Sequence, residues 1–299
     1  MKYNLPGFQY KVWLPAALLS ALAFSGCFLA GDDEGVPAYI HIPSFKLETQ
    51  PGTQGSAAQK ITDVWVSVND RFLGVYPLPA TVPVLESGQV DVLLEAGIKD
   101  NGINGTSVSY PFYRIYETSA DLEIGEVDTL RPVVTYLSGL KFAAIEDFES
   151  SNLLFNKLLN SGGDGLVRTT GDVFEGDYSG LIRLDKDHPV QEITTTRLFK
   201  DLTTVSPVVY LEVSYKAEAP VIFGVIGYGS GLSTPILDPG FAPKDTWNKI
   251  YFNLSSLLTD PQYTDGYQLV MQAFIPQVNG QLEMDSAKVW LDNIKLLHL

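Results

Sequence analysis

The sequence predicts an all-β protein made of two successive β-sandwiches. Short segments rich in valine, isoleucine, threonine and aromatic residues recur along most of the chain, which is typical of strands. Glycine, proline, asparagine and aspartate separate these segments, as expected for turns. The sequence shows no alternation of strands with helices, no glycine-rich phosphate loop and no heptad repeat, which argues against α/β and coiled-coil folds.

The N-terminal segment has the pattern of a secretory signal peptide. Lys2 and Lys11 are its only charges, and residues 12–24 (VWLPAALLSALAF) are uncharged. This apolar run is shorter than the roughly 20 residues that a membrane-spanning helix needs. Two small residues, Ser25 and Gly26, then precede Cys27, the only cysteine of the 299 residues.

The order of apolar, small, small and cysteine resembles the lipobox of bacterial lipoproteins, although Phe24 stands where leucine is usual. The resemblance implies that residues 1–26 are removed and that diacylglycerol is attached to the Cys27 sulfur. It also implies acylation of the new amine, as with palmitate, so that lipid anchors the protein to a membrane. The alternative is an ordinary signal peptide followed by a chance cysteine.

Residues 27–35 are expected to form an acidic tether. Phe28 replaces the aspartate that retains lipoproteins in the inner membrane, so we expect the outer membrane. The acidic cluster of residues 32–34 is similar to the export tags of surface lipoproteins, which would place the protein on the cell surface. It can equally be read as a solvated tether.

The composition excludes nucleic acid as a partner and disulfide bonds as a means of stabilisation. Removal of residues 1–26 leaves 273 residues with 18 basic and 35 acidic side chains, a net charge of −17. Nucleic acid is therefore excluded as a partner, because phosphate binding needs clustered lysine and arginine. With one cysteine the chain has no internal disulfide, and its length is enough for two domains.

Residues 36–139 are predicted to form an immunoglobulin-like or transthyretin-like sandwich. In residues 61–69 (ITDVWVSVN) three valines alternate with other residues, as in a half-buried strand, and Asn69-Asp70 predicts a tight hairpin turn. We expect residues 36–47 to be an edge strand because of Pro37 and Pro43, and residues 99–106 to be an exposed loop tip. Six further strands are predicted at residues 71–76, 81–85, 89–96, 107–117, 119–126 and 130–137.

Residues 140–299 are predicted to form a larger jelly-roll sandwich. A short helix is expected at residues 153–159. The predicted strands are residues 144–148, 179–184, 192–199, 208–217, 221–227, 249–254, 267–275 and 287–297.

Five segments of this half occur in an order that resembles the galactose-binding-like jelly rolls of carbohydrate-binding modules. These are IEDFES (145–150), GDYSGLIRL (176–184), YLEVSYKA (210–217), TWNKIYFNL (246–254) and VWLDNIKLL (289–297). The resemblance implies a polysaccharide ligand, and a structural Ca²⁺ between the first and last strands. The positions that match such a calcium site are Asp147, Glu149 and Asp292, carboxylates of the kind that Ca²⁺ prefers. The alternative is that they are solvated edge carboxylates.

A saccharide site needs aromatic rings and planar polar side chains on one sheet face. Glu212 on one strand, and Gln268 and Gln272 on another, are polar residues at alternating positions, and Tyr178 and Tyr228 are aromatic residues near turns. We therefore predict saccharide contacts from these five side chains. Trp247 and Trp290 are predicted to be packing residues.

The sequence predicts no catalysis. His41, His188 and His298 lack the spacing of a zinc site, and no G-x-S-x-G nucleophile motif is present. Clustered acids typical of a glycosidase strand are also missing. Two function classes remain: a non-catalytic envelope lipoprotein that binds a glycan, and a structural or assembly lipoprotein that contacts other envelope proteins.

Overall fold

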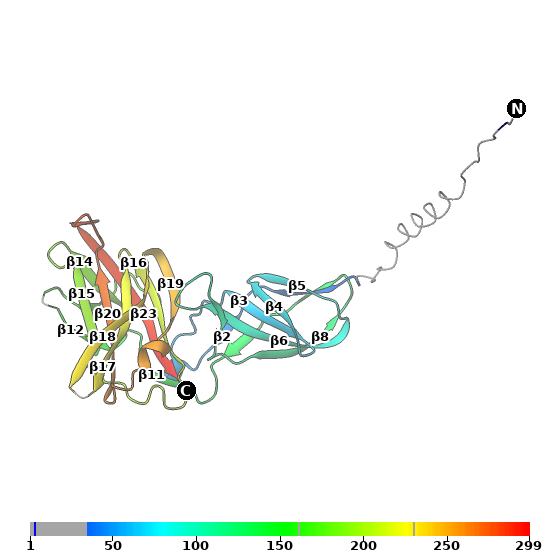
Figure 1. Cartoon of the computed structure of the whole chain (residues 1–299), viewed down its shortest axis with the longest axis horizontal. Helices are drawn as coiled ribbons and strands as arrows, with labels where there is room; N and C mark the ends of the chain where they lie inside the picture. The colour runs from blue at the N-terminus through cyan, green and yellow to red at the C-terminus, as the bar shows by residue number, and fades with distance from the viewer. Residues whose placement is uncertain (1–2, 4–34, 161, 230) are drawn as a thin grey trace.

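The structure is a computed structural model that describes residue 3 and residues 35–160, 162–229 and 231–299. These residues form two β-sandwiches arranged in series (Figure 1), which confirms the predicted all-β class. The signal peptide, the acidic tether up to residue 34 and Cys27 lie outside the described residues. In the part of the chain that is described, no helix has the length and apolarity to cross a membrane.

The N-terminal sandwich packs one antiparallel sheet against two smaller ones. The larger sheet has the order β4-β3-β6-β7, and β8 pairs with another part of β6. The smaller sheets are β5-β1-β9 and β2-β10. The strands are β1 (Ala38–Ile42), β2 (Lys46–Glu48), β3 (Asp63–Val68), β4 (Arg71–Pro77), β5 (Ala80–Val84), β6 (Gly88–Lys99), β7 (Ser107–Ser109), β8 (Tyr116–Leu122), β9 (Val127–Thr129) and β10 (Val133–Thr135).

The β3–β4 hairpin follows the sequence pattern closely. The three valines of β3 at positions 64, 66 and 68 are fully buried, whereas Trp65 and Ser67 on the other face are partly exposed. Asn69 and Asp70 both have positive φ, 47° and 62°, as the predicted two-residue turn requires. Asparagine and aspartate tolerate this conformation because their short polar side chains bond to nearby backbone.

Two expectations for the first half need correction or extension. β1 is the central strand of its sheet and not an edge strand, because Pro37 and Pro43 flank it and leave residues 38–42 free to pair on both sides. The loop of residues 99–106 is largely exposed, as predicted, but it also contacts the second sandwich. Asn101 N–H donates to the Tyr251 carbonyl at 3.0 Å, and Asn253 N–H donates to Asn101 Oδ1 at 2.8 Å.

The C-terminal sandwich consists of two larger sheets with one hydrophobic core between them. The first, here called the junction sheet, has the order β13-β14-β23-β16-β19, with β11 also paired to β23; the second, here called the distal sheet, has the order β12-β15-β20-β17-β18. Junction-sheet strands are β11 (Lys141–Glu146), β13 (Leu166–Thr169), β14 (Ser179–Asp185), β16 (Val209–Ala217), β19 (Lys244–Asn253) and β23 (Ser286–His298). Distal-sheet strands are β12 (Phe155–Leu158), β15 (Val190–Thr195), β17 (Val221–Gly229), β18 (Leu232–Phe241) and β20 (Gly266–Phe274). The small remaining elements are α2 (Pro51–Gln54), η1 (Ser255–Leu258) and the hairpin β21 (Gln277–Val278) with β22 (Gln281–Leu282).

Two segments of the second half differ from prediction. The helix expected at residues 153–159 is wrong: Phe155 is fully buried in the core, and residues 155–158 pair with β15 as strand β12. Pairing and burial outweigh the local helical pattern there. Strand β18 was not predicted because Pro235 and Pro239 interrupt it, and its place at the edge of the distal sheet is where proline is tolerated.

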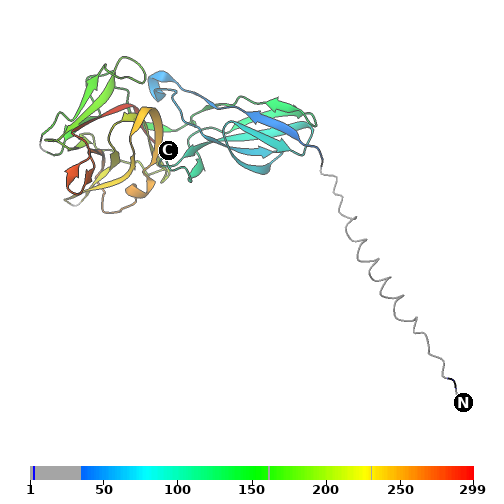
Figure 2. The same ribbon diagram turned by 90° about the horizontal axis from the view of Figure 1, so that it is seen from above.

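The two sandwiches meet on the outward face of the junction sheet. Tyr210, Tyr251 and Leu297 from that face pack into the core of the N-terminal sandwich. Seen from above (Figure 2), the C-terminus lies beside this junction, and Leu299 also packs against the N-terminal core. No distal-sheet residue among those that the structure describes packs into the core of the N-terminal sandwich.

Candidate functional site

The outward face of the distal sheet brings together three of the five predicted saccharide contacts. Residues of β20 alternate, so that Gln268 and Gln272 point outward while Tyr267, Leu269 and Met271 enter the core. β17 supplies Tyr228, and β15 supplies Glu192 opposite Gln272. We call Glu192, Tyr228, Gln268 and Gln272 the glutamine face.

Hydrogen bonds order these four side chains in two pairs. Tyr228 Oη donates to Gln268 Oε1 at 2.6 Å, and Gln268 Nε2 donates to the Thr196 carbonyl at 3.2 Å. Gln272 Nε2 donates to Glu192 Oε2 at 3.3 Å. These bonds hold the planar amides in fixed orientations. They use one N–H group of the Gln272 amide and one oxygen of the Glu192 carboxylate.

The chemistry of the glutamine face fits a neutral polar ligand. Val270 lies between the two glutamines on β20 and is fully buried, while Glu192, Tyr228 and Gln272 remain partly exposed. The partly exposed phenol ring, amide and carboxylate offer both stacking and hydrogen bonds to a sugar ring.

Tyr178 lies elsewhere, beside the start of β14 in the junction sheet. The Arg168 guanidinium covers its ring, with Cζ 3.7 Å from the ring centroid. Arg168 is itself held by the backbone carbonyls of Phe148 and Glu149. Tyr178 therefore takes part in a cation–π contact that fixes a loop, apart from the glutamine face.

Glu212 does not lie on an exposed face, contrary to prediction. It projects from the outward side of β16, where the N-terminal sandwich covers it completely, and its exposed fraction is 0%. Tyr110 Oη donates to Glu212 Oε1 at 2.9 Å, and Tyr136 Oη donates to both carboxylate oxygens at 3.0 and 3.1 Å. The strand pattern is as predicted, but a neighbouring domain occupies the space in which a saccharide would bind.

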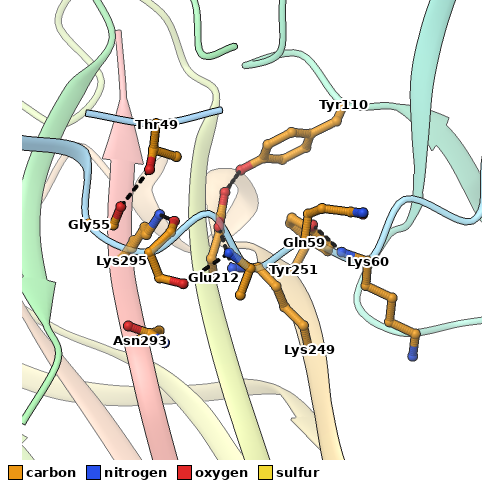
Figure 3. A network of polar contacts seen from close by, with 12 residues as sticks. Thr49, Gly55, Gln59, Lys60, Tyr110, Glu212, Lys249, Tyr251, Asn293 and Lys295 are labelled. Carbon is orange, nitrogen blue, oxygen red and sulfur yellow. Dashed lines mark hydrogen bonds and ion pairs between the residues drawn. The ribbon is translucent and has the colours of Figure 1, made fainter. Parts of the chain in front are cut away.

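Two buried lysines complete this network, which Figure 3 shows at the junction of the sandwiches. Lys249 Nζ lies 2.7 Å from Glu212 Oε2, and Lys295 Nζ donates to the Ser56 carbonyl and to Tyr136 Oη. Burial would raise the pKa of Glu212, but the charges of Lys249 and Lys295 outweigh it and hold the pKa below its usual value. Burial lowers the pKa of Lys295 to about 8.

The three predicted calcium ligands are each bonded to backbone N–H groups. Glu146 is buried, whereas Asp147 and Glu149, just beyond the end of β11, are exposed. Glu149 Oε1 accepts the N–H groups of residues 177 and 178, and Asp147 Oδ1 accepts the Glu149 N–H. Asp292 accepts the N–H groups of residues 174, 175 and 293, and its burial raises its pKa to about 7.

The three carboxylates do not line one common cavity. Asp147 and Glu149 line a cavity of about 290 Å³ together with Glu175 and Asn293, but Asp292 is fully buried and is not in its wall. Among the residues that the structure describes, no three histidine, cysteine, aspartate or glutamate side chains lie close enough to hold a metal ion. Glu149 and Asp292 hold the loop of residues 174–178 through its backbone N–H groups.

A cluster of aromatic residues on the junction sheet was not predicted as a surface. Trp290 and Trp247, which were predicted to be packing residues, are both partly exposed on the outward face of this sheet. Trp247 Nε1 donates to Asp172 Oδ1 at 2.8 Å, and the Phe174 ring, 40% exposed, lies 5.5 Å from the Trp247 ring. The signal for Trp290 was its position between two core residues of β23, which on a strand points it outward.

Comparisons with known proteins find similarity in structure only. No protein-family profile and no curated protein matches the sequence. The CBM22-1 xylan-binding domain of Xyn10C from Paenibacillus barcinonensis aligns with a TM-score of 0.38 and 14% identity, over 52% of this chain and 93% of that domain. The family 30 carbohydrate-binding module of a Clostridium thermocellum cellulosomal cellulase aligns with a TM-score of 0.35 and 15% identity, over 46% of this chain and 84% of that one. Similarity at this level carries no argument about a ligand.

Proposed function

We propose that the protein is a lipid-anchored, non-catalytic envelope protein whose C-terminal sandwich binds a polysaccharide on the glutamine face. The observation that carries the proposal is the convergence of Tyr228, Gln268 and Gln272, with Glu192, on one sheet face, where all of them but Gln268 are partly exposed. A partly exposed phenol ring beside planar hydrogen-bonding groups matches the apolar and polar surfaces of a sugar ring.

Affinity electrophoresis and a glycan array test this proposal with the full chain. We expect a saccharide to be retained by the protein, and Gln272→Ala and Tyr228→Ala each to weaken retention about tenfold. The matched control is Gln277→Ala, an exposed glutamine of the β21–β22 hairpin. Trp290→Ala locates the alternative: loss of binding only in this variant would move the site to the junction sheet and refute the glutamine face.

The second candidate function is structural: the protein would contact other envelope proteins. A separate observation supports it. β4 is the terminal strand of its sheet, and it exposes Phe72 by 57% and Val75 by 41%. An apolar edge strand of this kind is suited to pairing with another chain. Two results together would favour this function: no saccharide bound on the glycan array, and crosslinks to envelope proteins that are lost in Phe72→Ser.

The lipid anchor is a separate part of the proposal, and it concerns residues outside the described ranges. Labelling of cells with a palmitate analogue is expected to mark the protein, and Cys27→Ser is expected to remove the label. Fractionation would then test the outer membrane. Label that persists in Cys27→Ser would refute anchoring at this cysteine.

A structural calcium ion is also a proposal, and it would require Asp147 and Glu149 to exchange backbone donors for the ion. If Ca²⁺ is bound, EDTA lowers the melting temperature and added Ca²⁺ restores it. An unchanged melting temperature in both steps would show that the protein binds no structural Ca²⁺.

A further inference from the structure

An exposed apolar cluster lies at one end of the N-terminal sandwich, where β1 starts and which points away from the C-terminal sandwich (Figure 2). Its members are Val36, 63% exposed, Leu85, 72%, Ile124, 62%, and Val127, 56%. Of the four most exposed large apolar side chains in the described parts of the two sandwiches, at 62–72%, three belong to this cluster. Single exposed apolar residues are common on protein surfaces, whereas a cluster of them marks a contact surface. We call these four residues the apolar tip.

Strand pairing and a bonded turn bring the apolar tip together from three chain segments. Leu85 directly follows β5, and the end of β5 pairs with the start of β1. Val127 begins β9, which pairs with β1 in parallel, so both strands start at this end. The Gly125 N–H donates to the Pro37 carbonyl at 3.0 Å, which holds the β8–β9 turn, with Ile124, beside the start of β1. The cluster is therefore a fixed part of the sandwich surface.

The apolar tip also lies close to the proposed lipid anchor along the chain. Val36 stands nine positions after Cys27, and nine extended residues reach about 30 Å at most. If Cys27 carries lipid, this end of the sandwich cannot move farther than that from the bilayer surface. Anchoring would therefore hold the four apolar side chains at a high local concentration beside the membrane.

The charges around the apolar tip limit the kind of bilayer that it fits. Glu123 and Glu126 are exposed on the β8–β9 turn. Glu86 directly follows Leu85 and is partly exposed. These carboxylates can stay hydrated at the level of lipid headgroups, but the negative surface potential of anionic lipid would repel them. The apolar tip is therefore suited to a surface of zwitterionic lipid.

We infer that the apolar tip rests on the bilayer that holds the Cys27 lipid, with its four side chains among zwitterionic headgroups. This inference rests on the proposed lipid anchor. The contact adds buried apolar area to that of the acyl chains. Because the two sandwiches are arranged in series, it also holds the C-terminal sandwich, with its glutamine face, away from the membrane (Figure 1).

The test uses the full chain, lipidated in cells and reconstituted in phosphatidylcholine vesicles. Cys27 is the only cysteine and its sulfur would carry lipid, so Leu85→Cys supplies one free thiol for a fluorescent label. The matched control is Val278→Cys, which places the label at an exposed apolar position of the β21–β22 hairpin. We expect nitroxide on the lipid headgroups to quench the label at position 85 several-fold more than the label at position 278. Quenching at position 85 should fall when phosphatidylglycerol replaces part of the lipid, and an increase would contradict the zwitterionic preference.

A second substitution tests whether the apolar tip itself makes the contact. In labelled Leu85→Cys protein, Ile124→Asp should abolish the excess quenching. Ile103→Asp, at an exposed apolar position on the loop that contacts the C-terminal sandwich, should leave it unchanged. Unchanged quenching in Ile124→Asp would refute the inference.

Failure of the anchor and failure of the apolar tip give different results in this experiment. Protein that does not float with the vesicles would refute the lipid anchor and, with it, the membrane contact. Protein that floats with the vesicles but shows equal quenching at positions 85 and 278 would leave the anchor in place and refute the contact of the apolar tip.

Discussion

Strands β16 and β20 make an instructive pair, because both carry polar residues at alternating positions on the outward face of a sheet. On β20, Gln272 stays partly exposed and bonds to Glu192, and Gln268, 8% exposed, bonds to Tyr228. On β16, Glu212 is fully buried because the N-terminal sandwich packs against it. The comparison shows that the role of an outward strand face depends on its neighbour in space as much as on its own pattern.

Burial also changes what each polar group contributes. A buried carboxylate is stable only with full hydrogen bonding and counter-charge, which Tyr110, Tyr136 and Lys249 supply to Glu212. Partly exposed groups such as Glu192 and Gln272 contribute little to stability, since water can replace their partners. The two faces should therefore respond oppositely: substitutions at the junction affect stability, and those on the glutamine face affect binding.

The largest expected effect is that of Glu212→Gln. It leaves Lys249 and Lys295 buried without a counter-charge and should lower the free energy of unfolding by about 3–5 kcal/mol in urea denaturation. Glu192→Gln, at the corresponding outward position of the distal sheet, should change it by less than about 0.5 kcal/mol. Equal losses of stability from the two substitutions would contradict the proposed difference between the buried junction face and the glutamine face.

A smaller loss is expected for Tyr136→Phe. The phenol hydroxyl donates to both oxygens of a buried carboxylate, and its removal should cost about 1.5–3 kcal/mol. Tyr116→Phe, on the partly exposed β8, is the matched control and should be near neutral in the same urea denaturation. If Tyr136→Phe were as stable as the wild type, the network would not hold the junction together.

The junction also predicts a pH dependence. The pKa of Lys295 is about 8 in the folded protein against an ordinary value of 10.5. Between these values the unfolded chain binds more protons, so the contribution of Lys295 to stability rises with pH. Between pH 7.5 and pH 9.5 we expect a gain of about 1–2 kcal/mol that Lys295→Met lacks. The buried tyrosines have raised pKa values and act in the opposite direction, but only above pH 10. Parallel pH profiles for wild type and variant would contradict this assignment.

The smallest change in stability belongs to the glutamine face. Gln272→Ala removes a partly exposed side chain whose amide bonds only to Glu192 at 3.3 Å. The free energy of unfolding should change by about 0.5 kcal/mol or less, while saccharide retention falls. A large loss of stability would mean that Gln272 serves the fold and not a ligand.

The sequence predicts strands well where alternation is regular and the turn chemistry is explicit. The β3–β4 hairpin is the clearest case, because three buried valines and the Asn69-Asp70 turn agree. Phe155 shows a limit, since its burial and pairing with β15 make a strand of a segment with a helical pattern.

The candidate site, like the strands, could be predicted only in part from the sequence. Alternation along one strand places Gln268 and Gln272 on the same face, whereas Tyr228 joins them only through the pairing of β17 with β20 in the structure. The burial of Glu212 could not be predicted, because it depends on Tyr110 and Tyr136, which lie far away in sequence and belong to another domain. No local pattern states which face of a sandwich a second domain will cover.

Hydrogen–deuterium exchange with a saccharide identified on the array is the most direct test of saccharide binding by the distal sheet. The ligand is predicted to protect residues 221–229 and 266–274, the strands β17 and β20, and to leave the junction strands unchanged. Protection confined to the outward face of the junction sheet, or to the N-terminal sandwich, would contradict the glutamine face as the binding site.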